Sequence, residues 1–176
     1  MTLSIYDATI PPMTSALRSL SRILDKGAAY AEAKKIDPAE LLNARLAPDM
    51  FPLTRQVQIA CDQLKGCAAR LAGVEIPAHP DTETSFDELK ARIETVIGFA
   101  TAIDRSKFDG AEDRPVTMKL GPNEVTFPAP AFAFEFSAPN FYFHVSMTYA
   151  ILRQNGVEIG KQDLLAGLGR YFGRAG

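Results

Sequence analysis

The sequence contains very few of the residues that carry most metal and redox chemistry. Its 176 residues include 2 Cys, 2 His and no Trp. Two cysteines are too few for a disulfide scaffold, and no CxxC redox or zinc motif is present. Cys61 and Cys67 lie within one expected helix, where their spacing separates them by about 9 Å along the axis, too far for a disulfide. We expect two free thiols whose side chains fill the core. Free thiols fit a reducing cytoplasm.

The sequence also lacks an excess of positive charge and a long apolar run. Its 19 Lys and Arg residues are balanced by 21 Asp and Glu residues, so little charge is available to neutralise the phosphates of a nucleic acid. No window approaches 18 uncharged apolar residues, and the first residues do not resemble a signal peptide. We therefore expect no nucleic-acid partner, no membrane insertion and no export.

Common catalytic motifs are absent as well. There is no GxGxxG after a strand, no GxxxxGK[ST], no GxSxG and no HExxH. What the sequence does contain is a hydrophobic fraction of 47%, which excludes a disordered chain. The length is that of one domain, which we expect to span residues 1–176.

Apolar residues recur at spacings of three and four over four long segments, a pattern typical of amphipathic helices. The expected helices span 13–30, 53–71, 85–103 and 130–155, with a short helix at 39–46. The first helix could begin at Pro11 and Pro12, with a separate turn before them. The last helix is the ambiguous one, because the phenylalanines of 131–138 alternate as in a strand. It either kinks at Pro139 or begins only at Asn140.

The apolar period changes from 3.6 to 2 between the third and fourth long helices. Alternating residues at 116–120 and 125–127 flank a turn at 121–124, which predicts a small β-hairpin. Residues from Lys161 onward form a short apolar turn or helix. We therefore expect a mainly all-α fold, an antiparallel four-helix bundle with a small β-hairpin before the last long helix.

The two histidines occupy different settings. His79 lies between prolines in a loop, and we expect it to be solvated. His144 shares a helical face with apolar side chains and with Thr148, and so points into the bundle, where such folds build ligand sites. On the second long helix, Gln58 and Asp62 flank the apolar stripe and could face His144.

Two interpretations of His144 remain open from the residues alone. It could centre a site, or it could be a buried side chain whose hydrogen bond goes to Asp62, Gln58 or a tyrosine such as Tyr142 or Tyr149. The candidate pocket common to both is formed by His144, Thr148, Gln58, Asp62 and Tyr142.

Three stretches of sequence resemble the DinB/YfiT-like superfamily of four-helix bundles, and in particular its single-domain bacterial subfamily of unknown function. They are LLNARLAPDMFPLTRQVQIACD at 41–62, FDGAEDR at 108–114 and PNFYFHVSMTYAILRQNGVEIGKQDLL at 139–165. The resemblance extends over essentially the whole chain and implies a bundle of four helices that forms a homodimer. Members of this superfamily are often described as metalloenzymes.

The resemblance also implies what this chain lacks. Metal-binding relatives use one histidine on the second helix and an HxxxH pair on the last. His144 matches the first histidine of that pair, Thr148 replaces the second, and the position on the second helix falls near Gln58. We therefore expect a cytoplasmic small-molecule or partner-binding module with no metal or other cofactor.

The alternative is an enzyme that depends on a divalent metal such as zinc or nickel. It would be a transferase or hydrolase, similar to the thiol transferases among the relatives, in which His144, Asp62 and a third group hold the cation. The sequence leaves open whether the chain is an enzyme.

Overall fold

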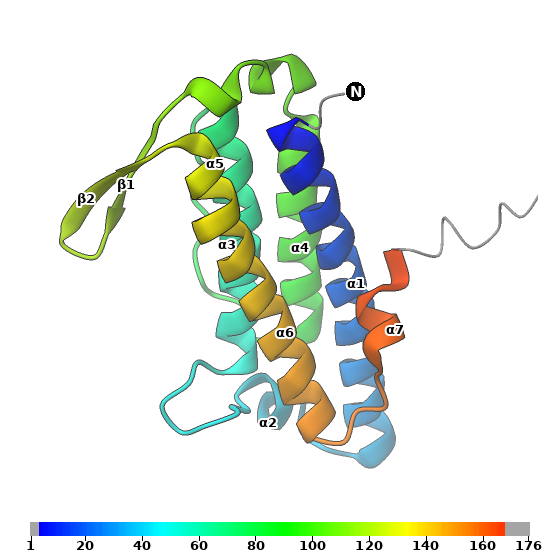
Figure 1. Cartoon of the computed structure of the whole chain (residues 1–176). Helices are drawn as coiled ribbons and strands as arrows, with labels where there is room; N and C mark the ends of the chain where they lie inside the picture. The colour runs from blue at the N-terminus through cyan, green and yellow to red at the C-terminus, as the bar shows by residue number, and fades with distance from the viewer. Residues whose placement is uncertain (1–3, 168–176) are drawn as a thin grey trace, which may run out of the picture.

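The protein, as a computed structural model, is a bundle of four long helices with a β-hairpin at one end (Figure 1). The structure describes residues 4–167. The long helices are α1 (Ile5–Lys34), α3 (Leu53–Ala72), α4 (Phe86–Ala102) and α6 (Ala138–Gln154). The shorter elements are α2 (Pro38–Leu42), η1 (Arg105–Phe108), η2 (Ala111–Asp113), β1 (Val116–Leu120), β2 (Asn123–Phe127), α5 (Ala129–Ala131), η3 (Phe132–Ser137) and α7 (Lys161–Leu164). The expected mainly helical fold with a hairpin before the last long helix is confirmed.

The expected antiparallel arrangement does not hold for every pair of neighbouring long helices. Residues from the first half of α3 meet residues from the start of α4, as in the contact of Asp62 with Arg92, so α3 and α4 run in the same direction. The loop 73–85 makes this possible, because its extended reach of about 40 Å exceeds the length of α3, about 30 Å. The loop returns along the bundle before α4 begins (Figure 1).

Helix α1 begins at Ile5, so the expected start near Met13 is wrong, and Pro11 and Pro12 lie inside the helix. Each proline removes one main-chain hydrogen bond. Burial of Ile5 and Ile10 opposes that cost, since both side chains are almost fully removed from water.

The first turn of α1 is also capped at its free N–H groups. The hydroxyl of Ser4 accepts from the Asp7 N–H, and a Glu112 carboxylate oxygen accepts from the Ile5 N–H at 3.0 Å. Together the caps and the buried face allow the helix to continue through two prolines.

Helix α2 ends at Leu42, four residues before the expected end at Leu46. The Ala44 carbonyl accepts a hydrogen bond from the Leu53 N–H, the first residue of α3, at 3.0 Å. This bond ties the chain just after α2 to the start of α3, where the helical path has ended. The other expected ends agree with the structure more closely, and Ser85 and Glu88 form the capping box that their spacing indicates.

The ambiguous segment 131–138 is helical. Helix α5, the π-helical η3 and α6 follow one another without a break. The alternative in which the helix begins only at Asn140 is therefore wrong. The Ala138 N–H donates to the Ala133 carbonyl, five residues back. This wider turn comes immediately before Pro139, which has no N–H and whose ring would crowd an ordinary α-helical turn.

The hairpin pairs Val116 with Phe127 and Leu120 with Asn123 around a turn in which Gly121 has a φ of 59°. The ring of Phe127 stacks on Phe136 at 5.7 Å, and Phe136 stacks on Phe132 at 6.1 Å. The alternating phenylalanines therefore lie on a helix. The rings of Phe132 and Phe136 pack against the hairpin through Phe127. No helix of residues 4–167 is long and apolar enough to cross a membrane.

Two glycines in long helices offer a matched test of packing. A Cβ at buried Gly27 would lie 3.1 Å from Leu152 and 3.2 Å from Phe86, whereas a Cβ at Gly98 would meet nothing within 4 Å. We expect Gly27→Ala to lower the free energy of unfolding by about 1–3 kcal/mol through overpacking. Gly98→Ala should raise it by about 0.5–1 kcal/mol, since alanine stiffens the unfolded chain. Urea unfolding of both variants measures the difference, and equal effects would contradict this account of the α1 interface.

Candidate functional site

His144 lies on the inner face of α6 and is 7% exposed. Its Nδ1 lies 2.6 Å from Oε1 of Gln56, on α3. Gln56 is itself 1% exposed, so the two side chains form a polar contact within the interface of α3 and α6. Buried polar groups are retained in such places when they satisfy one another.

The hydrogen bonds of Gln56 determine the tautomer of His144. The Gln56 amide nitrogen donates to the Phe51 carbonyl at 3.0 Å, which orients the amide oxygen toward the imidazole. An amide oxygen can only accept, so Nδ1 of His144 carries the hydrogen. The Nε2 atom is then left with a free lone pair.

The surroundings of His144 keep the ring neutral. Burial lowers its pKa below the usual 6.5, and the positive charge of Arg55 lowers it further. Among residues 4–167, we find a hydrogen-bond partner only for Nδ1 of this ring. At neutral pH, His144 therefore presents an unprotonated Nε2 as a hydrogen-bond acceptor.

An aromatic side chain borders the pair. The ring of Phe143 meets the His144 ring edge-on, with centroids 5.1 Å apart, and Phe143 is 50% exposed. Phe51, whose carbonyl accepts from Gln56, is also exposed. The exposed Phe143 ring thus offers apolar surface next to the polar pair.

Thr148 lies one turn after His144 and is fully buried. Its hydroxyl donates to the His144 carbonyl at 3.0 Å, a bond within the helix. Thr148 therefore lies on the same helical face as His144, as its spacing indicates. Its hydroxyl hydrogen is used in a bond to the main chain.

Gln58 and Asp62 lie away from His144. The Gln58 amide donates to Glu83 at 2.8 Å, and Asp62 contacts Lys65 at 2.9 Å and Arg92 at 3.1 Å. These contacts face α4 and the loop before it. The hydrogen-bond partner of His144 is therefore Gln56, two residues before the position that the family resemblance indicates.

Tyr142 is directed elsewhere too. Two residues on an α-helix differ in direction by about 200°, which takes Tyr142 to the other side of α6 from His144. There it lines a cleft of about 240 Å³ together with Pro12, Ser15 and Leu164. Burial raises the pKa of the Tyr142 phenol.

The side chain that sequence reasoning missed is Gln56. Helix α3 is packed between α4 and α6, and 14 of its 20 residues are buried, so the apolar pattern does not show which polar residue faces which helix. One signal was available: Gln56 comes three residues after Leu53 and four before Ala60, on the same stripe. A buried glutamine inside an apolar stripe indicates a polar partner on the facing helix.

Both cysteines are free and buried, as expected. Burial raises the pKa of Cys61 to about 12 and that of Cys67 to about 11. At neutral pH neither thiol forms the reactive thiolate. Neither cysteine therefore supplies a nucleophile at neutral pH.

The residues around His144 are a poor set of metal ligands. Residues 4–167 contain no group of three or more His, Cys, Asp and Glu side chains placed to hold a metal ion. Beside the imidazole stand the Gln56 amide and the Thr148 hydroxyl, both engaged in hydrogen bonds and both weak ligands for zinc or nickel. This donor set does not fit a divalent metal.

The assigned tautomer predicts a response to charge. We expect Gln56→Glu to raise the pKa of His144, because a carboxylate at this position favours the imidazolium. In the unchanged protein the pKa is lower when folded than when unfolded. Protonation therefore favours the unfolded chain, and this contribution to stability is lost as the pH falls below about 6.5. NMR titration of the His144 ring measures the pKa, and nitrogen chemical shifts report the tautomer.

The matched control for this substitution is Gln154→Glu, at an exposed position near the end of α6. It adds the same charge without contact to the ring and should leave the pKa of His144 nearly unchanged. If both variants shift the pKa equally, the contact of Gln56 does not govern it.

Comparisons with known proteins agree with this architecture. Residues 5–165 match a family described as Domain of unknown function (DUF1993). The crystal structure of a DinB family member protein from Shewanella denitrificans is similar to the chain with a TM-score of 0.85. It shares 42% sequence identity over 91% of this chain and 90% of that chain. No curated protein matches. The chain therefore belongs to the DUF1993 family and has the helical fold of DinB family proteins.

Proposed function

We propose that this chain is a binding module for a small organic molecule, held at a site centred on His144. One observation carries the proposal: the imidazole is fixed by Gln56 and neutral, and Nε2 is open as an acceptor at the edge of the core. A polar atom that the surrounding residues hold in a fixed orientation, and that has no hydrogen-bond partner within the described residues, is typical of binding sites.

The neighbours of His144 indicate what kind of molecule fits. The open Nε2 accepts a hydrogen bond, so the ligand must carry a donor such as a hydroxyl or an N–H group. Exposed Phe143 offers a ring surface for an apolar or aromatic part. The Arg55 charge, which lowers the pKa of the imidazole, disfavours a cation.

A metal-dependent enzyme is the weaker proposal. It would need at least three good ligands, and His144 supplies only one. Asp62, the second ligand of that alternative, is held by Lys65 and Arg92 on a different side of α3. Binding without a metal or other cofactor is therefore what we propose, whereas homodimer formation and a cytoplasmic location stay predictions.

A matched pair of probes tests the hydrogen bond. Phenol carries the required donor beside an apolar ring, and anisole has a methyl group in place of that hydrogen. We expect phenol to shift the His144 and Phe143 resonances in a saturable way. Anisole should bind at least about tenfold more weakly, since its ether oxygen can only accept.

The variant His144→Asn removes Nε2 and so tests its role in binding. The asparagine amide can still donate to Gln56 as Nδ1 does, but it lacks the second ring nitrogen. We expect this variant to fold and to lose the preference for phenol, whereas Gln154→Ala on the exposed end of α6 should keep it. Equal binding of both probes to the unchanged protein, or unchanged preference in His144→Asn, would overturn the proposal.

A further inference from the structure

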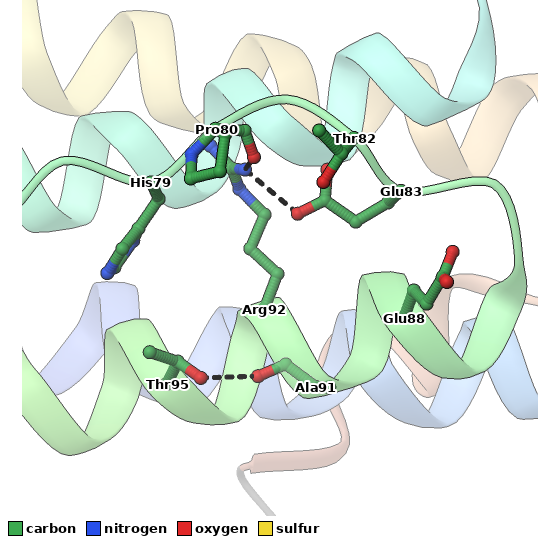
Figure 2. A pocket seen from close by; sticks show the side chains of 8 residues that line it. All are labelled: His79, Pro80, Thr82, Glu83, Glu88, Ala91, Arg92 and Thr95. Atoms are coloured by element: carbon green, nitrogen blue, oxygen red, sulfur yellow. Dashed lines mark hydrogen bonds and ion pairs between the residues drawn. The ribbon is translucent and has the colours of Figure 1, made fainter.

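The loop before α4, residues 73–85, passes over the bundle and is held there by contacts with the buried Arg92. We call residues 79–83 the strap. Arg92 rises from α4 to the strap (Figure 2), and its side chain is only 3% exposed. The strap and α4 enclose a groove of about 320 Å³.

Three hydrogen bonds and one further ion pair hold the two terminal nitrogens of Arg92. Its Nη1 donates to the Pro80 carbonyl at 3.0 Å and to Glu83 at 2.9 Å. Its Nη2 contacts Asp62 at 3.1 Å and Asp81 at 2.9 Å. A guanidinium has one further N–H, on Nε. In the described structure this Nε is buried and has no hydrogen-bond partner.

His79 contributes a second unused atom to the same groove. The sequence suggests a solvated loop residue, but the side chain is only partly exposed, and its Nδ1 is buried without a partner in the described residues. Burial lowers the pKa of His79, and the charges of Lys65 and Arg92 lower it further. The ring is therefore neutral at neutral pH, and Nδ1 can serve as an acceptor.

Buried polar atoms without a hydrogen-bond partner are uncommon in folded proteins. A buried donor without an acceptor destabilises the protein, and the cost is recovered when a bound group supplies the missing partner. Arg92 and His79 both line the groove of Figure 2, with Ala91 and Thr95 from α4 along its floor. A ligand in the groove therefore lies against the side chains that carry these two atoms and against the α4 surface of Ala91 and Thr95.

The charge around the groove gives an anion no attraction. Three carboxylates, those of Asp62, Asp81 and Glu83, face three cations. These cations are Arg92, Lys65 and Arg55, the last of which pairs with Asp81. Glu88 also lines the groove and adds one negative charge, and its carboxylate accepts from the N–H groups of Thr84 and Ser85 at the start of α4. An anion therefore gains no net attraction from this cluster.

We propose that the groove beneath the strap is a second binding site, specific for a neutral carboxamide. The amide oxygen accepts from Nε–H of Arg92, and the amide nitrogen donates to Nδ1 of His79. The rest of the ligand lies on Ala91 and Thr95. A carboxamide is an uncharged group that offers an acceptor and a donor on two neighbouring atoms.

Three probes of nearly equal shape distinguish the charge and the hydrogen bonds. They are benzamide, benzoate and benzamidinium, each titrated into the full chain at pH 7.5 and followed by NMR. We expect benzamide to shift the resonances of His79, Thr82 and Thr95 in a saturable way. Benzoate lacks the donor for His79 and benzamidinium lacks the acceptor for Arg92, so each should bind at least about tenfold more weakly.

Variants of exposed α4 residues locate the site without disturbing Arg92. Ala91→Leu places a larger side chain on the floor of the groove and should abolish benzamide binding. Ala102→Leu makes the same change at the exposed end of α4 and should leave binding unchanged. His144→Asn should also leave it unchanged, which separates this site from the one centred on His144.

Three results would overturn the proposal. One is the absence of any saturable shift with benzamide, in which case water alone serves the two open atoms. Another is equal affinity for the three probes. The last is unchanged benzamide binding by Ala91→Leu.

Discussion

The ion cluster around Arg92 is the constraint on which the arrangement of the helices depends. Parallel packing of α3 and α4 requires the chain to return along the whole bundle, and a long return loop has little secondary structure to hold it. Arg92 binds both the loop, through Pro80, Asp81 and Glu83, and α3, through Asp62. Because its guanidinium is almost fully buried, any arrangement that separates these groups leaves the charge of Arg92 buried and uncompensated. The cluster thus favours one position of the loop and one register of α4 against α3.

Helix α3 occupies the centre of this arrangement and therefore has two polar faces to satisfy. Gln56 is directed toward α6 and pairs with His144, whereas Gln58 is directed toward the strap and pairs with Glu83. Two residues along a helix differ by about 200° in direction, so neighbouring glutamines on one helix serve opposite interfaces. The site at His144 and the groove beneath the strap are consequently built on the two sides of the same helix. Arg55 connects them, since it pairs with Asp81 of the strap and its charge acts on His144.

Sequence periodicity identified the long helices, the hairpin and the burial of His144, because each depends on apolar residues that recur along one element. It failed where residues outside the element decide. The start of α1 at Ile5 depends on Glu112, more than one hundred positions away, and the early end of α2 depends on the bond from Leu53 to Ala44. The partner of His144 was missed for the same reason: with 14 of 20 residues of α3 buried, the facing helix, and not the stripe itself, selects Gln56. At 131–138 the phenylalanines alternate as in a strand, yet a π-helical turn before Pro139 keeps the segment helical.

The pairing of His144 with Gln56 also explains how this bundle can retain a buried histidine without a set of metal ligands. A buried imidazole needs a partner for its N–H, and an amide oxygen supplies one while the amide nitrogen is held by the Phe51 carbonyl. The pair is therefore stable with no third component, and the core does not require a ligand in order to fold. Among residues 4–167, the fold provides a hydrogen-bond partner for one nitrogen of His144 and for both terminal nitrogens of Arg92, and it leaves one nitrogen of each side chain without a partner. Since internal partners account for the other nitrogens of these two side chains, the nitrogens without a partner are where an external molecule has most to contribute to stability.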